Sequence, residues 1–144
     1  MGEIIRNNYV LHDTNTQQPL VWRMFQEQTF ELIRINEFSS KPSRYKSIYL
    51  FTSLEDAQKF IDQDKRDGTN IYSVKLLDES KEVHVASMKL YERIPLNRPT
   101  FPAIEEQAVQ YWKGVNNIDP VSEFKAELLT ESDVIVIETI KGNE

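Results

Sequence analysis

The strongest local pattern in the chain is an apolar strand followed at once by an amphipathic helix. Residues 46–52, KSIYLFT, contain five β-prone residues in a row and predict a strand. The spacing then becomes helical. Ser53, with Asp56 three residues later, is a typical capped helix start, and Gly68 marks the end. The apolar face of this helix is formed by Leu54, Ala57, Phe60 and Ile61.

Two further helices and five further strands follow from the same periodicities. Residues 21–38 fit a helical period and also a strand alternation, and we favour the helix. A third helix ends at Gly114. Its apolar face is formed by Ile104, Ala108, Tyr111 and Trp112. Strands are predicted over residues 7–13, 70–78, 82–88, 122–130 and 133–140.

The connections between these elements predict the fold class. The charged turn ESK between residues 70–78 and 82–88 predicts a hairpin, and ES at 131–132 is a two-residue turn between the last two strands. The apolar run from Val134 to Ile137 predicts a central strand. Three prolines between positions 95 and 102 predict a surface crossing. We therefore expect one α+β domain over residues 1–144, with a mixed or antiparallel sheet and about three helices.

Composition narrows the classes of partner. The net charge is -6 and basic runs are absent, which argues against duplex nucleic acid as a partner. The sequence lacks both a signal peptide and a run of about 18 apolar residues, so we expect a cytoplasmic protein without membrane contact. With no Cys and two His, disulfides, thiolate chemistry and a metal site are not expected.

Familiar catalytic motifs such as a Walker loop or G-x-G-x-x-G are absent, so candidate chemistry rests on single polar residues. Each has an ordinary structural explanation. His12 suits a hydrogen-bonded strand residue, Tyr49 a half-buried packing residue, and Ser53 a helix cap. Arg44, after Pro42, suits a partner for helix carbonyls or for a nearby glutamate.

Glu127 lies in a strand whose main apolar row points the other way. Phe124, Ala126 and Leu128 share one face of that strand, which puts Glu127 on the opposite face. The simplest interpretation is a solvated carboxylate that faces a lysine on a neighbouring strand.

The order of these segments resembles two nested groups of proteins. The quoted segments are YVLHD, PSRYKSIYLFTSLEDAQKF, NIYSVKL, AVQYWKG and the late AELL. Over most of the chain they resemble a bacterial domain family of unknown function. More widely they resemble the ADP-ribosyltransferase-like fold, which implies a split sheet with NAD bound in a cleft between its halves.

This wider resemblance implies roles for particular residues. It implies that His12 contacts the ribose, that Tyr49 with Thr52 and Ser53 packs the nicotinamide side, and that Glu127 supports the chemistry. Cleavage of the bond to nicotinamide builds positive charge on the ribose, and a fixed carboxylate stabilises that charge. Arg44 would then pair with the pyrophosphate.

Two positions depart from the pattern of that fold. LHDTN lacks the glycine that many relatives place after the histidine, and Lys125 stands where a second Glu or Gln is common. These departures weaken the case for transfer of ADP-ribose onto protein side chains. Asp133, with Glu131 two residues before it, is the alternative late acid.

Three functional hypotheses remain open from the sequence. The first is an ADP-ribosyltransferase-like domain that binds NAD or another ADP-ribose compound, as a transferase or glycohydrolase. The second is a non-catalytic module of the same fold that binds a small ligand or a protein. The third is an enzyme of this fold that removes a 2′-phosphate from RNA, against which the lack of a basic patch counts.

Overall fold

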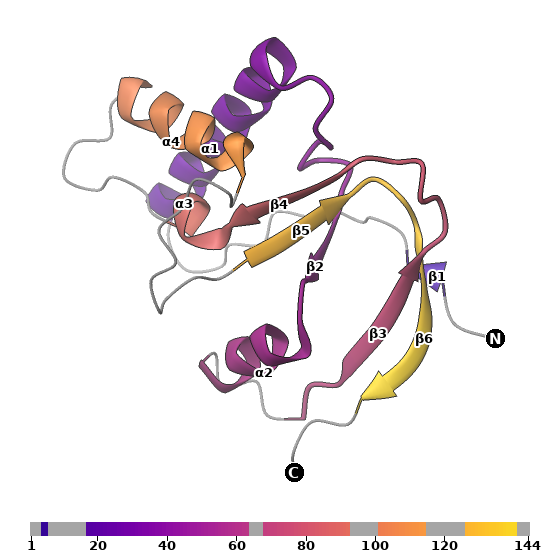
Figure 1. Cartoon of the computed structure of the whole chain (residues 1–144). Helices are drawn as coiled ribbons and strands as arrows, with labels where there is room; N and C mark the ends of the chain where they lie inside the picture. Colours follow the sequence, from indigo (N-terminus) through magenta and orange to yellow (C-terminus); the bar gives the residue numbers. More distant parts are fainter. Residues whose placement is uncertain (1–3, 6–16, 64–67, 93–100, 115–125, 141–144) are drawn as a thin grey trace.

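The computed structural model describes residues 4–5, 17–63, 68–92, 101–114 and 126–140, and in them six strands and four helices (Figure 1). In chain order these are β1 Ile4–Ile5, α1 Gln17–Glu37, β2 Ile48–Phe51, α2 Leu54–Gln63, β3 Ile71–Leu76, β4 Val83–Ser87, α3 Met88–Glu92, α4 Phe101–Lys113, β5 Ala126–Thr130 and β6 Val134–Ile140. The predicted α+β class is confirmed.

The strands form two separate three-stranded sheets, with all pairs antiparallel. One sheet has the order β1-β6-β3 and the other the order β2-β5-β4. The predicted central place of β6 is confirmed, since β6 lies between β1 and β3. Between Ser73 and Val74 the register against β6 shifts, which leaves Ile137 opposite no residue of β3.

The hairpin predicted around ESK is wrong, and the two strands that flank the predicted ES turn do not pair with each other either. β3 pairs with β6 and β4 pairs with β5, so the chain changes sheets at each of the two turns. The two turns at which the chain changes sheets are hydrogen-bonded to each other. The Leu77 amide donates to the Asp133 carbonyl at 2.9 Å, and the Asp78 amide donates to the Ser132 hydroxyl at 2.9 Å. Turn residues indicate where a strand ends, whereas its partner is decided by contacts that are distant in sequence.

Helices α1, α3 and α4 gather beside the β2-β5-β4 sheet, and α2 contacts β2 and β3, one strand of each sheet (Figure 1). The main core lies between α1, α4 and this sheet. It is formed by Phe30, Ala86, Ile104, Ala108, Tyr111, Trp112 and Leu129. The Trp112 indole donates to the Phe30 carbonyl at 2.8 Å and so joins α4 to α1. The helix that we favoured over residues 21–38 is confirmed up to Glu37, where α1 ends.

The ends of the helices test the predicted caps. The Asp56 amide donates to the Ser53 hydroxyl at 3.1 Å, which confirms the N-cap of α2. Gly114 has a φ of 84° directly after α4, which confirms its role as the stop. Pro102 lies in the first turn of α4 rather than in a surface crossing, because that turn needs no amide donor. The strand predicted over residues 82–88 is β4, which ends at Ser87, and α3 begins at the next residue, Met88.

Several predictions lie outside the described residues, namely the strand over 7–13 with His12, and residues 122–125 of the late strand. Within the described part of the chain, none of the helices combines the length and the apolar character needed to cross a bilayer.

Candidate functional site

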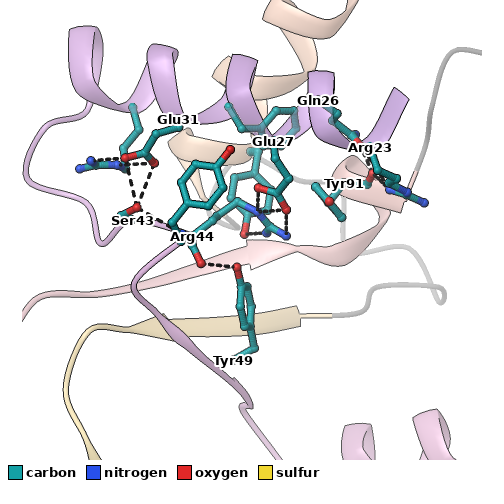
Figure 2. A network of polar contacts seen from close by, with 12 residues as sticks. Arg23, Gln26, Glu27, Glu31, Ser43, Arg44, Tyr49 and Tyr91 are labelled. Atoms are coloured by element: carbon teal, nitrogen blue, oxygen red, sulfur yellow. Dashed lines mark hydrogen bonds and ion pairs between the residues drawn. The ribbon is translucent and has the colours of Figure 1, made fainter. Parts of the chain in front are cut away.

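A buried carboxylate on α1 is the first component of the site. Glu27 lies three residues before Phe30, so both side chains point to the covered side of the helix. Glu27 is almost completely buried, as is its neighbour Gln26. Figure 2 shows Glu27 projecting from α1 toward Arg44, which comes from the loop before β2.

Arg44 binds this carboxylate with two of its nitrogens. Its Nε lies 3.0 Å from one Glu27 oxygen, and its Nη2 lies 3.0 Å from the other. This paired geometry is the strongest that arginine makes with a carboxylate. Only 5% of Arg44 is exposed, so water screens the pair little.

The remaining nitrogen of Arg44 meets two groups from α4 and β5. Nη1 donates to Oε1 of Glu127 at 2.9 Å and to the Tyr111 hydroxyl at 2.6 Å. The Tyr111 hydroxyl in turn donates to the same Glu127 oxygen at 2.6 Å. We call Glu27, Arg44, Tyr111 and Glu127 the buried cluster; it joins α1, the loop before β2, α4 and β5.

The electrostatics of the buried cluster keep both donors protonated. Burial by itself lowers the pKa of Arg44, but the surrounding tyrosines and the two glutamates raise it well above its ordinary value. Burial also raises the pKa of Tyr111 well above 10, with Arg44 opposing and Glu127 adding to the shift. The buried cluster therefore places one guanidinium between two carboxylate side chains.

Aromatic rings enclose the guanidinium. The Cζ atom of Arg44 lies 3.8 Å from the ring centre of Tyr91 on α3, within the range of a cation–π contact. Arg23 and Gln26 of α1 both donate to the Tyr91 carbonyl, at 2.9 and 2.7 Å. Below the guanidinium, the Tyr49 hydroxyl donates to the Arg44 carbonyl at 2.7 Å (Figure 2).

The structure brings three of the predicted site residues together and separates two. Arg44, Tyr49 and Glu127 lie at one place. Thr52 and Ser53 are exposed beyond the end of β2, where Ser53 caps α2 and Thr52 lies 3.5 Å from the Asp56 carboxylate. The prediction for His12 lies outside the described residues.

The interpretation of Glu127 as a solvated partner of lysine is wrong. Glu127 is buried, and its charged partner is Arg44. Strand alternation was correct in separating Glu127 from Leu128, but the face of Glu127 is the one that α1 and α4 cover, with Leu129 in the main core. The alternative acid, Asp133, precedes β6, and its carbonyl accepts from the Leu77 amide.

Sequence reasoning missed two members of the buried cluster. Tyr111 was predicted on the apolar face of its helix, which its complete burial confirms, but its hydroxyl also holds Glu127. Glu27 was not singled out. The signal that could have found it is its place, with Gln26, on the apolar side of a helix, since a buried carboxylate requires a paired charge.

Among the described residues, no group of three or more His, Cys, Asp and Glu side chains could hold a metal ion. A family model described as protein of unknown function (DUF2441) matches residues 4–142, nearly the whole chain. In the search of curated proteins, none matches the chain.

Proposed function

The chain belongs to the DUF2441 family, and we propose that it is an ADP-ribosyltransferase-like domain that binds NAD or another ADP-ribose compound. In this proposal Glu127 is the carboxylate that faces the ribose. The observation that carries it is how this side chain is held: it lies on the central strand of one half of a split sheet, and the described residues hold it through one oxygen alone.

The other oxygen of Glu127 supports this role. Both donors, Arg44 and Tyr111, meet Oε1, and among the described residues Oε2 has no hydrogen-bond donor. The Glu127 side chain is 11% exposed. Oε2 is therefore the atom that would accept a hydrogen bond from a ribose hydroxyl.

The chemistry follows from where charge develops. Departure of nicotinamide leaves positive charge on the ribose, and a carboxylate already fixed by two donors needs no reorientation to stabilise it. In this proposal Arg44 and Tyr111 are positioning residues, because they act through Glu127.

This assignment gives Arg44 a different role from the pyrophosphate contact implied by the resemblance. Its three nitrogens already donate to groups of the buried cluster, two of which are carboxylates. An incoming diphosphate would compete with these acceptors in a site that carries more acidic than basic side chains. We therefore assign Arg44 to holding Glu127 rather than to binding the cofactor.

An aromatic residue stands directly beside the proposed ribose contact. Phe51 of β2 is opposite Glu127 of β5 in the antiparallel ladder, so the two side chains share a face. Phe51 is exposed, and its ring centre lies 5.2 Å from that of Phe60 on α2. In the proposal Phe51 stacks on nicotinamide together with Tyr49, while Thr52 and Ser53 supply polar contacts beyond it.

Release of nicotinamide from NAD by the purified protein tests the proposal. Glu127→Gln keeps the shape of the side chain but removes its charge, and we expect it to abolish release. Glu31→Gln is the matched control, because Glu31 of α1 is also paired with an arginine but lies outside the buried cluster. Equal release by the wild type and Glu127→Gln would remove Glu127 from the mechanism.

A non-catalytic module of the same fold is the second candidate. The observation that favours it is that Arg44 is already paired with Glu27 and Glu127, so the burial of its charge is explained without any ligand. Under this candidate the wild type releases no nicotinamide, and Glu127→Gln lowers only the free energy of unfolding. Nicotinamide release by the wild type therefore separates the two candidates, and unfolding curves of the wild type and Glu127→Gln show how much of the effect of the substitution is structural.

A further inference from the structure

The outward face of α1 carries large apolar side chains that the protein leaves in solvent. Four of them are about half exposed or more: Val21 at 62%, Met24 at 46%, Leu32 at 60% and Ile35 at 52%. Gln28, also exposed, lies midway between them. We call these five residues the outer stripe; it lies on the opposite side of α1 from Phe30. An exposed apolar area of this kind is typical of an interaction surface.

The spacing of the outer stripe is symmetric about Gln28. Met24 and Leu32 lie four residues to either side of it, and Val21 and Ile35 lie seven residues to either side. If two copies of α1 pack antiparallel with a two-fold axis at Gln28, Val21 faces Ile35 of the other copy and Met24 faces Leu32. The two Gln28 side chains then meet on the axis, where their amides can bond to each other. The steps of three and four residues are those of helices that pack along a seam.

We propose that the outer stripe is the contact through which two copies of this chain pair, with their α1 helices antiparallel. The stripe carries no charge, and Glu31 on its flank is already neutralised by Arg34 at 2.7 Å and accepts from the Ser43 hydroxyl at 3.1 Å. The side chains of the outer stripe therefore add no charge repulsion of their own to this contact. Antiparallel helices also place opposite dipole ends side by side.

The area available is of the right order for a specific contact. From their exposed fractions, the four apolar side chains expose roughly 400 Å² in each copy, and pairing removes about twice that from water. Gln28 at the centre of the stripe and the partly exposed Phe25 on its flank bring the total toward the roughly 1,000 Å² that a specific interface needs. A helix of 21 residues is about 31 Å long, enough to hold all five contacts.

Cysteine cross-linking tests the symmetry, because the chain contains no cysteine of its own. Under mild oxidation of the full chain, Gln28→Cys is expected to give a disulfide-linked dimer, since the two substituted positions meet on the axis. Val21→Cys alone is the matched control and is expected to stay monomeric on a denaturing gel. Val21→Cys combined with Ile35→Cys is expected to link. Linkage by Val21→Cys alone, or none by Gln28→Cys, would overturn the proposed arrangement.

Sedimentation equilibrium of the full chain gives the second test. We expect about twice the chain mass for the wild type and the chain mass for Leu32→Glu, a change at an exposed position that leaves the core intact. A wild-type monomer at about 100 μM would overturn the proposal. Leu32 is exposed and is not a member of the buried cluster, so Leu32→Glu leaves that cluster unchanged, and the nicotinamide assay succeeds or fails independently of this test.

Discussion

Two arginine–glutamate clusters tie α1 to the loop that follows it, and they differ in burial and reach. In the buried cluster, Arg44 and Glu27 have side chains that are 6% and 2% exposed. In the other cluster, Arg34 and Glu31 are 14% and 17% exposed and lie three residues apart on one helix. We call Arg34, Glu31 and Ser43 the outer cluster.

The difference shows that an arginine–glutamate pair can stabilise either a local segment or contacts between distant segments. Arg34 fastens the end of α1, since it also donates to the Lys41 carbonyl at 2.9 Å. Arg44 joins distant segments, because it bonds Glu27 of α1 and also the Glu127 carboxylate of β5, which lies 83 residues after Arg44. We therefore expect disruption of the outer cluster to loosen only the end of α1, and disruption of the buried cluster to lower the stability of the whole fold.

The largest expected effect is the loss of Arg44. Arg44→Met leaves two carboxylates buried without their counter-ion and is expected to lower the free energy of unfolding by about 3–5 kcal/mol. Arg34→Met is the matched control and is expected to cost roughly 1 kcal/mol. Urea unfolding of both variants measures this.

If Arg44→Met does not fold, Arg44→Lys retains a charge but not the paired geometry, and we expect it to cost about 2 kcal/mol. Equal losses for the Arg44 and Arg34 substitutions would show that burial does not distinguish the two clusters.

The second effect is confined to alkaline pH. The folded protein raises the pKa of Tyr111 well above 10, so the unfolded chain loses this proton first. The resulting stability is fully present below pH 10 and is lost as the pH rises above it, at up to about 1.4 kcal/mol per pH unit. Tyr111→Phe, which also costs about 1–2 kcal/mol at neutral pH, removes this loss.

Unfolding in urea from pH 8 to 11 measures the alkaline effect, and Tyr49→Phe serves as the comparison for a half-buried tyrosine of the same site. An unchanged alkaline slope in Tyr111→Phe would contradict the account.

The smallest expected effect is that of salt. The coupling between Arg34 and Glu31, measured by a double-mutant cycle, should fall from about 0.5 kcal/mol toward zero in 1 M NaCl, because partly exposed charges are screened. The coupling between Arg44 and Glu27 should change little. A similar decrease in both pairs would mean that water reaches the buried cluster.

Local signals predicted most of the elements, because they depend on residues close in sequence. The Ser53 cap, the Gly114 stop and the apolar face of α4 each needed only a few neighbouring positions. The strand partners could not be predicted this way. ESK and ES were correct turns but gave no information on which sheet the next strand joins, and both crossings change sheets.

The candidate site was predicted in part for the same reason. The resemblance pointed to Arg44, Tyr49 and Glu127, which do meet. It gave no partner for them, because the contacts to Glu27 and Tyr111 span 17 and 67 residues from Arg44. The lysine assigned to Glu127 followed from strand alternation, which cannot show that two helices cover that face.

The most direct measurement is saturation-transfer NMR of the full chain with NAD, ADP-ribose and nicotinamide, repeated on Glu127→Gln and on the control Glu31→Gln. We predict transfer to the ribose protons of NAD and ADP-ribose in the wild type and the control, with nicotinamide formed only where Glu127 is intact. Absence of transfer from all three ligands would contradict the proposed function and leave the buried cluster as a structural tie between α1, α4 and β5.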